Sequence, residues 1–385
     1  MFNLKFIIED PVVLSALIII VIAFAYQIFH LIFFRKKFAR CKTTYSADAF
    51  YELPPVSVVL CLRDDYSTLK SDIPILLNQE YPDYEIVIVN FSTNATYAEK
   101  IDTWSKQNSK LTVVRINQSD NFNCSKVYPL ALGVKSARND IILLTDSNCR
   151  PSSIHWIRSM VSKYSESHTN VAGISNYEKK GTFANKFMRY EMALYNINLF
   201  SYLKAAGNYH VDTKNFMFNK KDFLSQKDLP SFFTVSNDGS AILSRLANKA
   251  QTGTMINDYA QMQDNRQYSF GAWFATVSSR YSNYKFIKPL PKFVKGLFVT
   301  TTLLSVLMAI WFMYYTCFNL LICIFCLLLS LVRIAVWFFT TKKSLVDIGQ
   351  KDLNLDIFLY DFILVFLRPV LYVSASIRHN NKLWS

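Results

Sequence analysis

The sequence is poor in charge, in glycine and in the spacings that mark common cofactor sites. Charged residues make up only 18% of the 385 residues, and glycine occurs 9 times. No Gly-x-Gly-x-x-Gly or P-loop pattern follows any run typical of a strand, which excludes the dinucleotide-binding and Walker classes. The 5 histidines contain no pair at helical spacing, so a histidine-based zinc site is not expected. The 7 cysteines are irregularly spaced, which favours a reducing compartment.

The chain is instead rich in apolar and basic residues. Hydrophobic residues account for 51% of it and aromatic residues for 15%, more than soluble domains usually carry, so we expect part of the chain to lie in lipid. Lysine and arginine number 42 against 28 acidic residues, a net charge of +14. The positive charge is concentrated beside the apolar segments, which favours anionic membrane lipid as its partner and argues against nucleic acid.

The first apolar segment predicts a transmembrane helix over residues 11–34. No charged residue occurs between Asp10 and Arg35, and this length suffices for a hydrocarbon core of about 30 Å. Basic residues cluster directly after the segment, whereas the tail 1–10 has a single lysine. This asymmetry predicts a non-cytoplasmic tail and a cytoplasmic domain after the span.

Two further apolar segments lie near the C-terminus. Residues 296–341 contain one charge, Arg333, over a length that suits a transmembrane hairpin of two helices. Residues 356–377 are interrupted by Asp361 and Arg368, so they form either a third C-terminal span or a helix in the membrane interface, which we favour. The remaining residues, 41–295, have the composition of one soluble domain.

Strands and helices alternate in the first half of this domain. Apolar runs over residues 56–62, 85–90, 111–116 and 140–146 predict buried strands, and helical spacing occurs over 67–78 and 125–138. This alternation predicts an α/β fold with a parallel sheet covered on both faces. Such sheets bind ligands at the carboxyl ends of their strands. Polar residues follow three of these ends, at 61–65, 90–93 and 146–149.

These stretches resemble a known family. The segments VSVVLCLRDD from Val56, LLNQEYPDYEIVIVN from Leu76, and KVYPLALGVKSARNDIILLTDSNC from Lys126 are similar, in this order, to family 2 inverting glycosyltransferases with the GT-A fold. The membrane pattern resembles the bacterial branch of that family. The resemblance implies a GT-A domain on the cytoplasmic face of the bacterial inner membrane. It also implies a nucleotide-sugar donor and a divalent Mg²⁺ or Mn²⁺ ion.

The resemblance also assigns residues to the donor site. The family ends its second strand with two acidic residues, where this chain has Asn90 and Phe91; the Asn90 amide retains the capacity to hydrogen-bond a nucleobase. The residues that we expect to contact the donor on this basis are Arg63, Asp65, Asn90, Ser92, Lys126 and Asp146.

The metal motif of the family, Asp-x-Asp, is present as Asp146-Ser147-Asn148. Asp146 and Asn148 are therefore the expected metal ligands, with a neutral amide oxygen in place of the second carboxylate. The alternative is that Asp146 only caps the turn that follows its strand, as aspartate often does.

The expected catalytic residues are Asp238 and Arg280. Asp238 is the only carboxylate where the family carries its general base, but the apolar register aligns Gly239 with that base, and Asn237-Asp238-Gly239 is also typical of an ordinary turn. Arg280, in Val277-SSRY, replaces the arginine of a Gln-x-x-Arg-Trp motif and is a candidate to hold the diphosphate leaving group. The alternative places Arg280 in the basic approach to the membrane.

Two functions follow from these residues. The first is a membrane-bound glycosyltransferase that transfers a sugar, with inversion, to a lipid-linked or envelope glycan acceptor near the membrane. The second is a non-catalytic GT-A scaffold with a protein partner, because each of the three acidic motifs lacks a carboxylate. The second function predicts a donor pocket filled by side chains, with Phe91 the expected plug.

Overall fold

The computed structural model describes most of the chain. The described residues are 10–43, 53–63, 66–92, 94–116, 126–207, 209–227, 229, 239–247, 251–266, 268–315 and 320–378. Two predicted site residues, Asp65 and Asp238, lie outside them.

The centre of the soluble domain is a seven-stranded sheet in the order β3-β2-β1-β4-β8-β6-β9. Strands β1 to β4 are parallel, which confirms the predicted parallel sheet, and β8 runs antiparallel to both of its neighbours. The strands are β1 Val56–Leu62, β2 Tyr84–Asn90, β3 Leu111–Arg115, β4 Ile141–Leu144, β6 Asn170–Gly173, β8 Phe216–Asn219 and β9 Thr252–Met255. Every residue of β1, β2 and β4 is buried, because helices cover both faces of the sheet.

Helices from the predicted βαβ units cover this sheet. On one face, α5 packs so tightly that a Cβ added to Gly133 would lie 2.6 Å from Val89 Cγ2 and 2.8 Å from Val59 Cγ1. On the other face lies a second apolar cluster that includes Trp156 and Ile101. The helices of this part are α3 Tyr66–Leu77, α4 Ala95–Gln107, α5 Val127–Ser136, α6 Trp156–Val161, α8 Lys220–Leu224 and α10 Ser240–Leu246.

A smaller sheet connects the soluble domain to the membrane helices. It has the order β5-β10-β7, with β5 Cys149–Pro151, β7 Ser175–Tyr177 and β10 Met262–Asp264. The 24-residue helix α7, Phe183–Ala206, follows it and is buried along most of its length. Helix α11, Phe270–Ser282, lies near it, and short 3₁₀ segments occupy Asp258–Ala260 and Asn283–Phe286.

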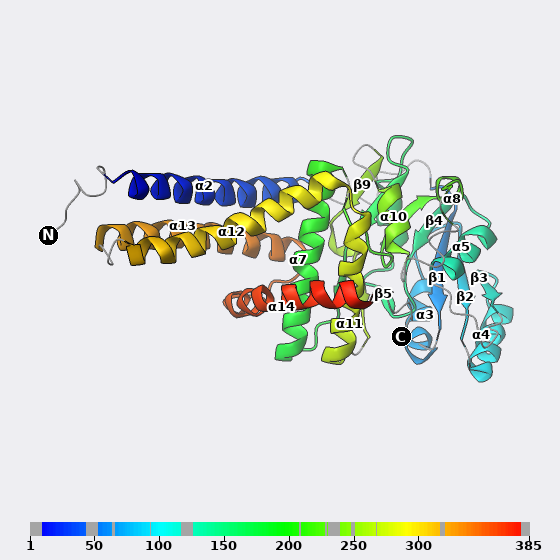
Figure 1. Cartoon of the computed structure of the whole chain (residues 1–385). Coiled ribbons are helices and arrows are strands. Elements are labelled where there is room, and N and C mark those ends of the chain that lie inside the picture. The colour runs from blue at the N-terminus through cyan, green and yellow to red at the C-terminus, as the bar shows by residue number, and fades with distance from the viewer. Residues whose placement is uncertain are drawn as a thin grey trace.

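Three long apolar helices extend together from the soluble domain, α2 Pro11–Ala39, α12 Pro289–Tyr315 and α13 Leu320–Asp347 (Figure 1). With α14, Asp356–Arg378, they are the four helices of the described chain that are long and apolar enough to cross a membrane. Polar contacts join the three between their apolar faces: Gln27 Nε2 donates to Ser305 Oγ at 3.1 Å, and Arg333 Nε donates to Gln27 Oε1. Such buried partners are what a polar side chain needs inside a bilayer.

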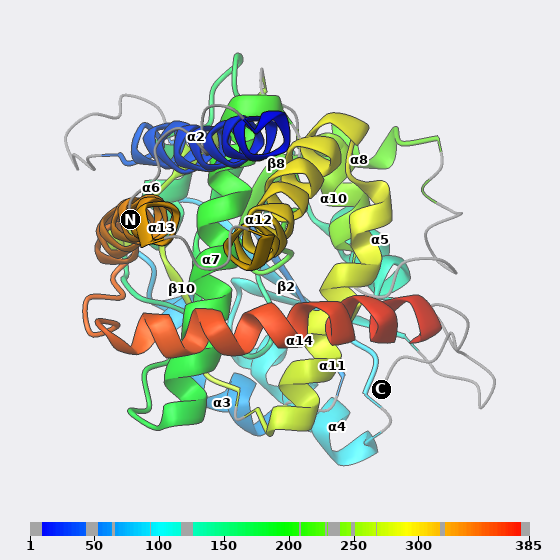
Figure 2. The ribbon, with the colours of Figure 1, turned by 60° about the vertical axis from the view of Figure 1, so that its left-hand side comes forward.

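Helix α14 takes a different direction from the other three. It runs across α7 and α11 at the base of the bundle, and α12 and α13 come forward past it (Figure 2). Whether residues 356–377 lie in the membrane interface or form a third C-terminal span stays a prediction.

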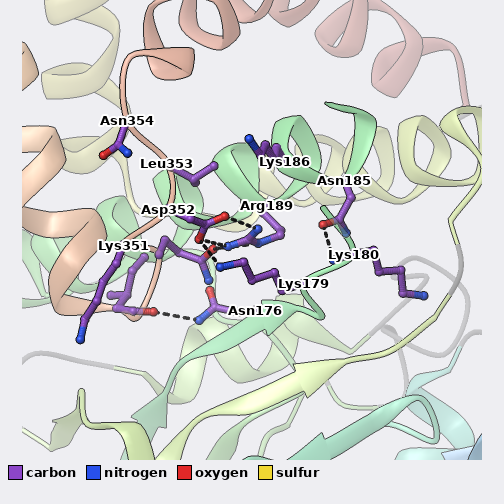
Figure 3. A network of polar contacts seen from close by, with 12 residues as sticks. Asn176, Lys179, Lys180, Asn185, Lys186, Arg189, Lys351, Asp352, Leu353 and Asn354 are labelled. Atoms are coloured by element: carbon purple, nitrogen blue, oxygen red, sulfur yellow. Dashed lines mark hydrogen bonds and ion pairs between the residues drawn. The ribbon is translucent and has the colours of Figure 1, made fainter. Parts of the chain in front are cut away.

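The segment between α13 and α14 is fixed to the soluble domain by a polar cluster (Figure 3). Arg189 on α7 makes two hydrogen bonds to the Asp352 carboxylate, at 2.7 and 2.9 Å, and its Nε donates to Gln350 Oε1 at 2.9 Å. Asn176 Nδ2 donates to the carbonyl of Ile348 at 3.2 Å. We call Arg189, Gln350 and Asp352 the linker clamp.

Candidate functional site

The carboxyl ends of β1, β2 and β4 meet at one edge of the large sheet. The register of β1 and β2 places Leu62 opposite Asn90. On the other side of β1, the Thr145 amide donates to the Val59 carbonyl at 3.1 Å, which continues the β1–β4 pairing toward Asp146. The sheet therefore brings the strand-end residues predicted from the sequence to one edge.

Asp146 begins the turn that follows β4. Its Oδ1 accepts a hydrogen bond from the Ser147 amide at 3.0 Å, and its carbonyl accepts one from Cys149. These contacts are those of the turn cap that the sequence offered as an alternative. The same carboxylate has a second set of contacts, so it is not only a cap.

The second set comes from Lys126, which lies directly before α5. Lys126 Nζ is 2.8 Å from both Oδ1 and Oδ2 of Asp146, and both side chains are largely buried. Burial alone would raise the pKa of Asp146, but the charges of Lys126 and Arg266 outweigh it and lower that pKa. Burial alone would lower the pKa of Lys126, and the charge of Asp146 outweighs it and raises that pKa. The pair is ionised on both sides.

A second buried pair lies beside the first. Lys214 Nζ is 2.7 Å from Asp264 Oδ2, and the two side chains are 10% and 2% exposed. Strand register places Asp264 opposite Cys149, next to the Asp-Ser-Asn turn, and Tyr268 donates its hydroxyl to Asp264 at 2.9 Å. We call Lys126–Asp146 and Lys214–Asp264 the donor-site pairs, after the donor site that the sequence predicts beside Asp146.

A small cavity opens against the first pair. Its lining residues are Val59, Cys61, Lys126, Leu130, Leu144, Thr145 and Thr213. Thr145 Oγ1 is buried there and has no hydrogen-bond partner among the described residues. A buried hydroxyl without a partner is uncommon in folded proteins, and the cavity of about 10 Å³ has room beside it for about one hydrogen-bonding atom, a water or a ligand oxygen. Phe91, the expected plug, is not a lining residue and lies in the core cluster with Val127.

The residues expected at the nucleobase form the turn between β2 and α4. Asn90 Oδ1 accepts from the Ser92 amide at 3.0 Å, and Ser92 Oγ accepts from the Asn94 amide at 3.1 Å. Arg63 directly follows β1, the neighbouring strand. Arg63, Asn90 and Ser92 therefore lie at adjacent strand ends, and their contact with a nucleobase stays a prediction.

Arg280 lies deeper in the protein than a residue of a basic membrane surface. It is 6% exposed, and its Nη1 is 3.1 Å from Glu191 Oε1 and 3.2 Å from Oε2. Its guanidinium also stacks on the ring of Tyr195 at 4.2 Å. The expected role on a leaving group stays a prediction, and the structure adds that Glu191 already balances the charge of Arg280.

The described residues do not fit a divalent ion at the Asp-Ser-Asn turn. Mg²⁺ and Mn²⁺ require oxygen ligands, and both carboxylate oxygens of Asp146 already accept from Lys126. An ion at those oxygens would lie beside a buried ammonium, where like charges repel strongly. Within the described part of the chain, no group of three His, Cys, Asp or Glu side chains could hold a metal.

Sequence reasoning missed both Asp264 and Glu191. Asp264 ends a strand of three residues, too short to show a period, and Glu191 lies within a helix buried almost all round. The one signal in the sequence for Asp264 was its position, because it is a carboxylate shortly before the segment that carries the predicted site residue Arg280.

Comparisons with known proteins agree with this architecture. The model of glycosyl transferase family 21 matches residues 15–382. The mannosyltransferase PcManGT from Pyrobaculum calidifontis, solved with GDP-Man and Mn²⁺, is similar with a TM-score of 0.52 and 13% identity, over 94% of this chain and 97% of that one. TarS 1–349 from S. aureus is similar with a TM-score of 0.39 and 11% identity, over 64% of this chain and 71% of that one. No curated protein matches the sequence.

The family match and the similarity to PcManGT confirm the predicted GT-A fold, and the family match supports the prediction of a glycosyltransferase, whose activity stays a prediction. The prediction of family 2 in particular is not confirmed, because the model that matches describes family 21.

Proposed function

Because the chain belongs to glycosyl transferase family 21, we propose that it transfers a sugar from a nucleotide-sugar donor to a lipid-linked or membrane-proximal acceptor, with inversion. The observation that carries the proposal is the Lys126–Asp146 pair, whose Lys126 lines a cavity at the carboxyl ends of β1 and β4. Ligands of open α/β sheets bind at this edge. A nucleotide sugar placed there has its diphosphate beside Lys126 and its base toward Arg63 and Asn90.

Polar side chains connect this site to the membrane helices, which supports an acceptor that arrives from the membrane. Tyr177 packs edge-to-face against Tyr268 at 5.1 Å, and Lys214 lies 5.5 Å above its ring. Arg280 and Glu191 also act on the hydroxyl of Tyr177. Tyr177 therefore lies between the donor-site pairs and the Arg280–Glu191 pair.

The same series of contacts continues into α12. Tyr281 packs on Tyr284 at 5.2 Å, and Lys295 of α12 donates to the Tyr284 hydroxyl at 2.9 Å. Helix α14, with Arg368, crosses α11 at this level (Figure 2). A lipid anchored in the bilayer thus has a polar route to the donor site, and Lys295 and Arg368 suit an acidic headgroup.

The proposed chemistry is a single displacement at the anomeric carbon. An acceptor hydroxyl attacks on the face opposite the diphosphate, the bond from that carbon to the diphosphate breaks, and the nucleoside diphosphate leaves with the electron pair. A base takes the acceptor proton, and Asp238 is our candidate from the sequence. Lys126 lines the cavity, and we expect its positive charge to stabilise the negative charge that develops on the leaving group.

The proposed location is the cytoplasmic face of a bacterial inner membrane. Arg35, Lys36 and Lys37 lie at the domain end of α2, and positive residues of this kind remain on the cytoplasmic side. A Mg²⁺ or Mn²⁺ cofactor stays a prediction. The described residues argue against it, because they do not fit a divalent ion at the Asp-Ser-Asn turn.

A transfer assay with the purified full chain tests the function. Radiolabelled UDP- and GDP-sugars are incubated with the protein and a bacterial membrane lipid extract, and labelled lipid is counted. We expect transfer from one donor class, and a rate lower by about 10²–10⁴ in Asp238→Asn because the base is lost. Inversion is checked by NMR of the product anomer.

Asp83→Asn is the matched control. Asp83 is an exposed carboxylate at the amino end of the same sheet, paired with Arg138, so its rate should equal that of the wild type. No transfer from any donor by folded protein would contradict the proposal and favour the non-catalytic scaffold.

A further inference from the structure

The Asp-Ser-Asn turn lies among three cations and three carboxylates. Lys126, Arg266 and Lys214 all act on Asp146, and Asp212 acts on Lys214 together with Asp264. Three cations minus the carboxylates Asp146, Asp264 and Asp212 leaves 0 in the described part of the site. A divalent ion would raise this to +2 before any donor binds. The protein therefore already balances the carboxylates that a metal would otherwise neutralise.

Lys126 also takes the position that a chelated ion would take. Its Nζ is 2.8 Å from each oxygen of the Asp146 carboxylate, so it bridges both. The neighbouring motif residue is the neutral Asn148 rather than a second carboxylate. With Asn148 in place of a second carboxylate, a divalent ion would bind more weakly because it would have one negative ligand fewer. A lysine carries a single positive charge, so the one carboxylate of Asp146 is enough to neutralise it.

Donor groups remain for a phosphate at this place. An ammonium has three N–H groups, and Asp146 accepts two of those of Lys126. Thr145 Oγ1 lines the same cavity and lacks a hydrogen-bond partner among the described residues. Lys126 also stands at the start of α5, a helix of 10 residues, whose peptide dipoles favour an anion at that end. Charge-assisted hydrogen bonds from such groups bind phosphate oxygens well.

We propose that this chain holds the diphosphate of its donor with Lys126 and the Thr145 hydroxyl, with Arg266 and Lys214 as further positive charges nearby, and without a divalent metal ion. The inference rests on the proposed function, since it concerns the same donor site. It differs from the metal-bound arrangement that the Asp-x-Asp resemblance implies.

Calorimetric titration of UDP and GDP into the detergent-purified full chain tests this, once in EDTA and once in Mn²⁺. We expect one nucleotide to bind in EDTA, with an affinity that Mn²⁺ changes by less than about threefold. Lys126→Ala should weaken binding in EDTA about tenfold or more, because a hydrogen bond to a charged group is lost. Lys126→Arg keeps the charge and should retain most of the affinity, which guards against a variant that fails to fold.

Lys135→Ala is the matched control, because Lys135 lies on the same helix, is exposed, and occupies its last turn. Its affinity should equal that of the wild type. Binding that requires Mn²⁺, or that Mn²⁺ strengthens tenfold, would overturn the inference and leave the proposed function intact. Unchanged affinity of folded Lys126→Ala in EDTA would also overturn it. If neither UDP nor GDP binds, in EDTA or in Mn²⁺, the result would overturn the proposed function itself.

Discussion

The linker clamp and the donor-site pairs are both buried sets of charges, but they are built differently. In the clamp, the guanidinium of Arg189 donates hydrogen bonds to both carboxylate oxygens of Asp352 and to the amide oxygen of Gln350. In the donor-site pairs, each carboxylate has a lysine, and unsatisfied hydroxyls lie nearby: Thr145 beside one pair and Tyr177 beside the other lack hydrogen-bond partners among the described residues.

We propose that this difference separates a structural role, in the clamp, from a ligand site at the donor-site pairs. A planar guanidinium with its partners in place leaves little capacity for another molecule, so the clamp fixes the segment before α14. A lysine is a point charge with a rotatable donor group, and a neighbouring hydroxyl without a partner is costly unless a ligand satisfies it. We therefore expect changes in the clamp to affect stability alone and changes in the donor-site pairs to affect nucleotide binding as well.

The largest effect on stability is expected from Lys214→Ala. This change leaves the carboxylate of Asp264, which is 2% exposed, without its cation, and removing one partner of a buried pair costs about 3–5 kcal/mol in the free energy of unfolding. Thermal unfolding in detergent measures it. The double variant Lys214→Met/Asp264→Asn should regain much of the stability but not the nucleotide affinity. Recovery of both would show that the pair is only structural.

The second-largest effect on stability is expected from Arg189→Ala, which should lower the free energy of unfolding by about 3 kcal/mol. The value is at the lower end because the Asp352 side chain is 24% exposed and water replaces part of the lost contact. Nucleotide affinity, measured by the same calorimetry, should not change. A tenfold loss of affinity in a folded Arg189→Ala protein would contradict the separation of the two regions.

The clamp also predicts a dependence on pH. The hydrogen bonds from Arg189 hold the pKa of Asp352 well below its usual range. A depressed pKa stabilises the folded state above the unfolded value of about 4, and the stabilisation is lost as the pH falls toward the folded pKa. Thermal unfolding between pH 6 and pH 3.5 should therefore show a steeper loss of stability in the wild type than in Arg189→Ala. Equal slopes would mean that Asp352 does not carry the effect.

The smallest effect is expected from Lys179→Ala. Lys179 also approaches Asp352, at 3.2 Å, but its side chain is 63% exposed, and exposed ion pairs contribute about 0.5 kcal/mol or less. Its unfolding temperature should lie within a degree or two of the wild type. A loss comparable to that of Arg189→Ala would show that charge alone, rather than the fork of the guanidinium, holds the linker.

The sequence predicted the parts of the fold whose burial leaves a pattern. Strand β1 is buried on both faces and is therefore a continuous apolar run, and α5 shows one apolar stripe against the sheet. Helix α4 was not predicted, because Ile101 is its only buried residue. Helix α7 is buried on nearly all sides and places Arg189 and Glu191 in the interior, so it has no polar face to reveal its period.

The sequence predicted site residues only where they lie near the carboxyl end of a predicted strand. Asp146 and Lys126 were expected near the donor, and the structure brings them together. The partner of Lys214 could not be inferred, because Asp264 is 50 residues away along the chain and is placed by the register of a short strand. Pairings of this kind depend on tertiary packing, which periodicity does not report.

The most direct test of the account is the initial rate of sugar transfer to membrane lipid in EDTA, compared with the rate in Mn²⁺. The account predicts transfer in EDTA at a rate similar to that in Mn²⁺, since Lys126 and its neighbouring cations supply the positive charge. Transfer that occurs only with Mn²⁺ would contradict it, and would mean that Asp146 exchanges Lys126 for a metal when the donor binds.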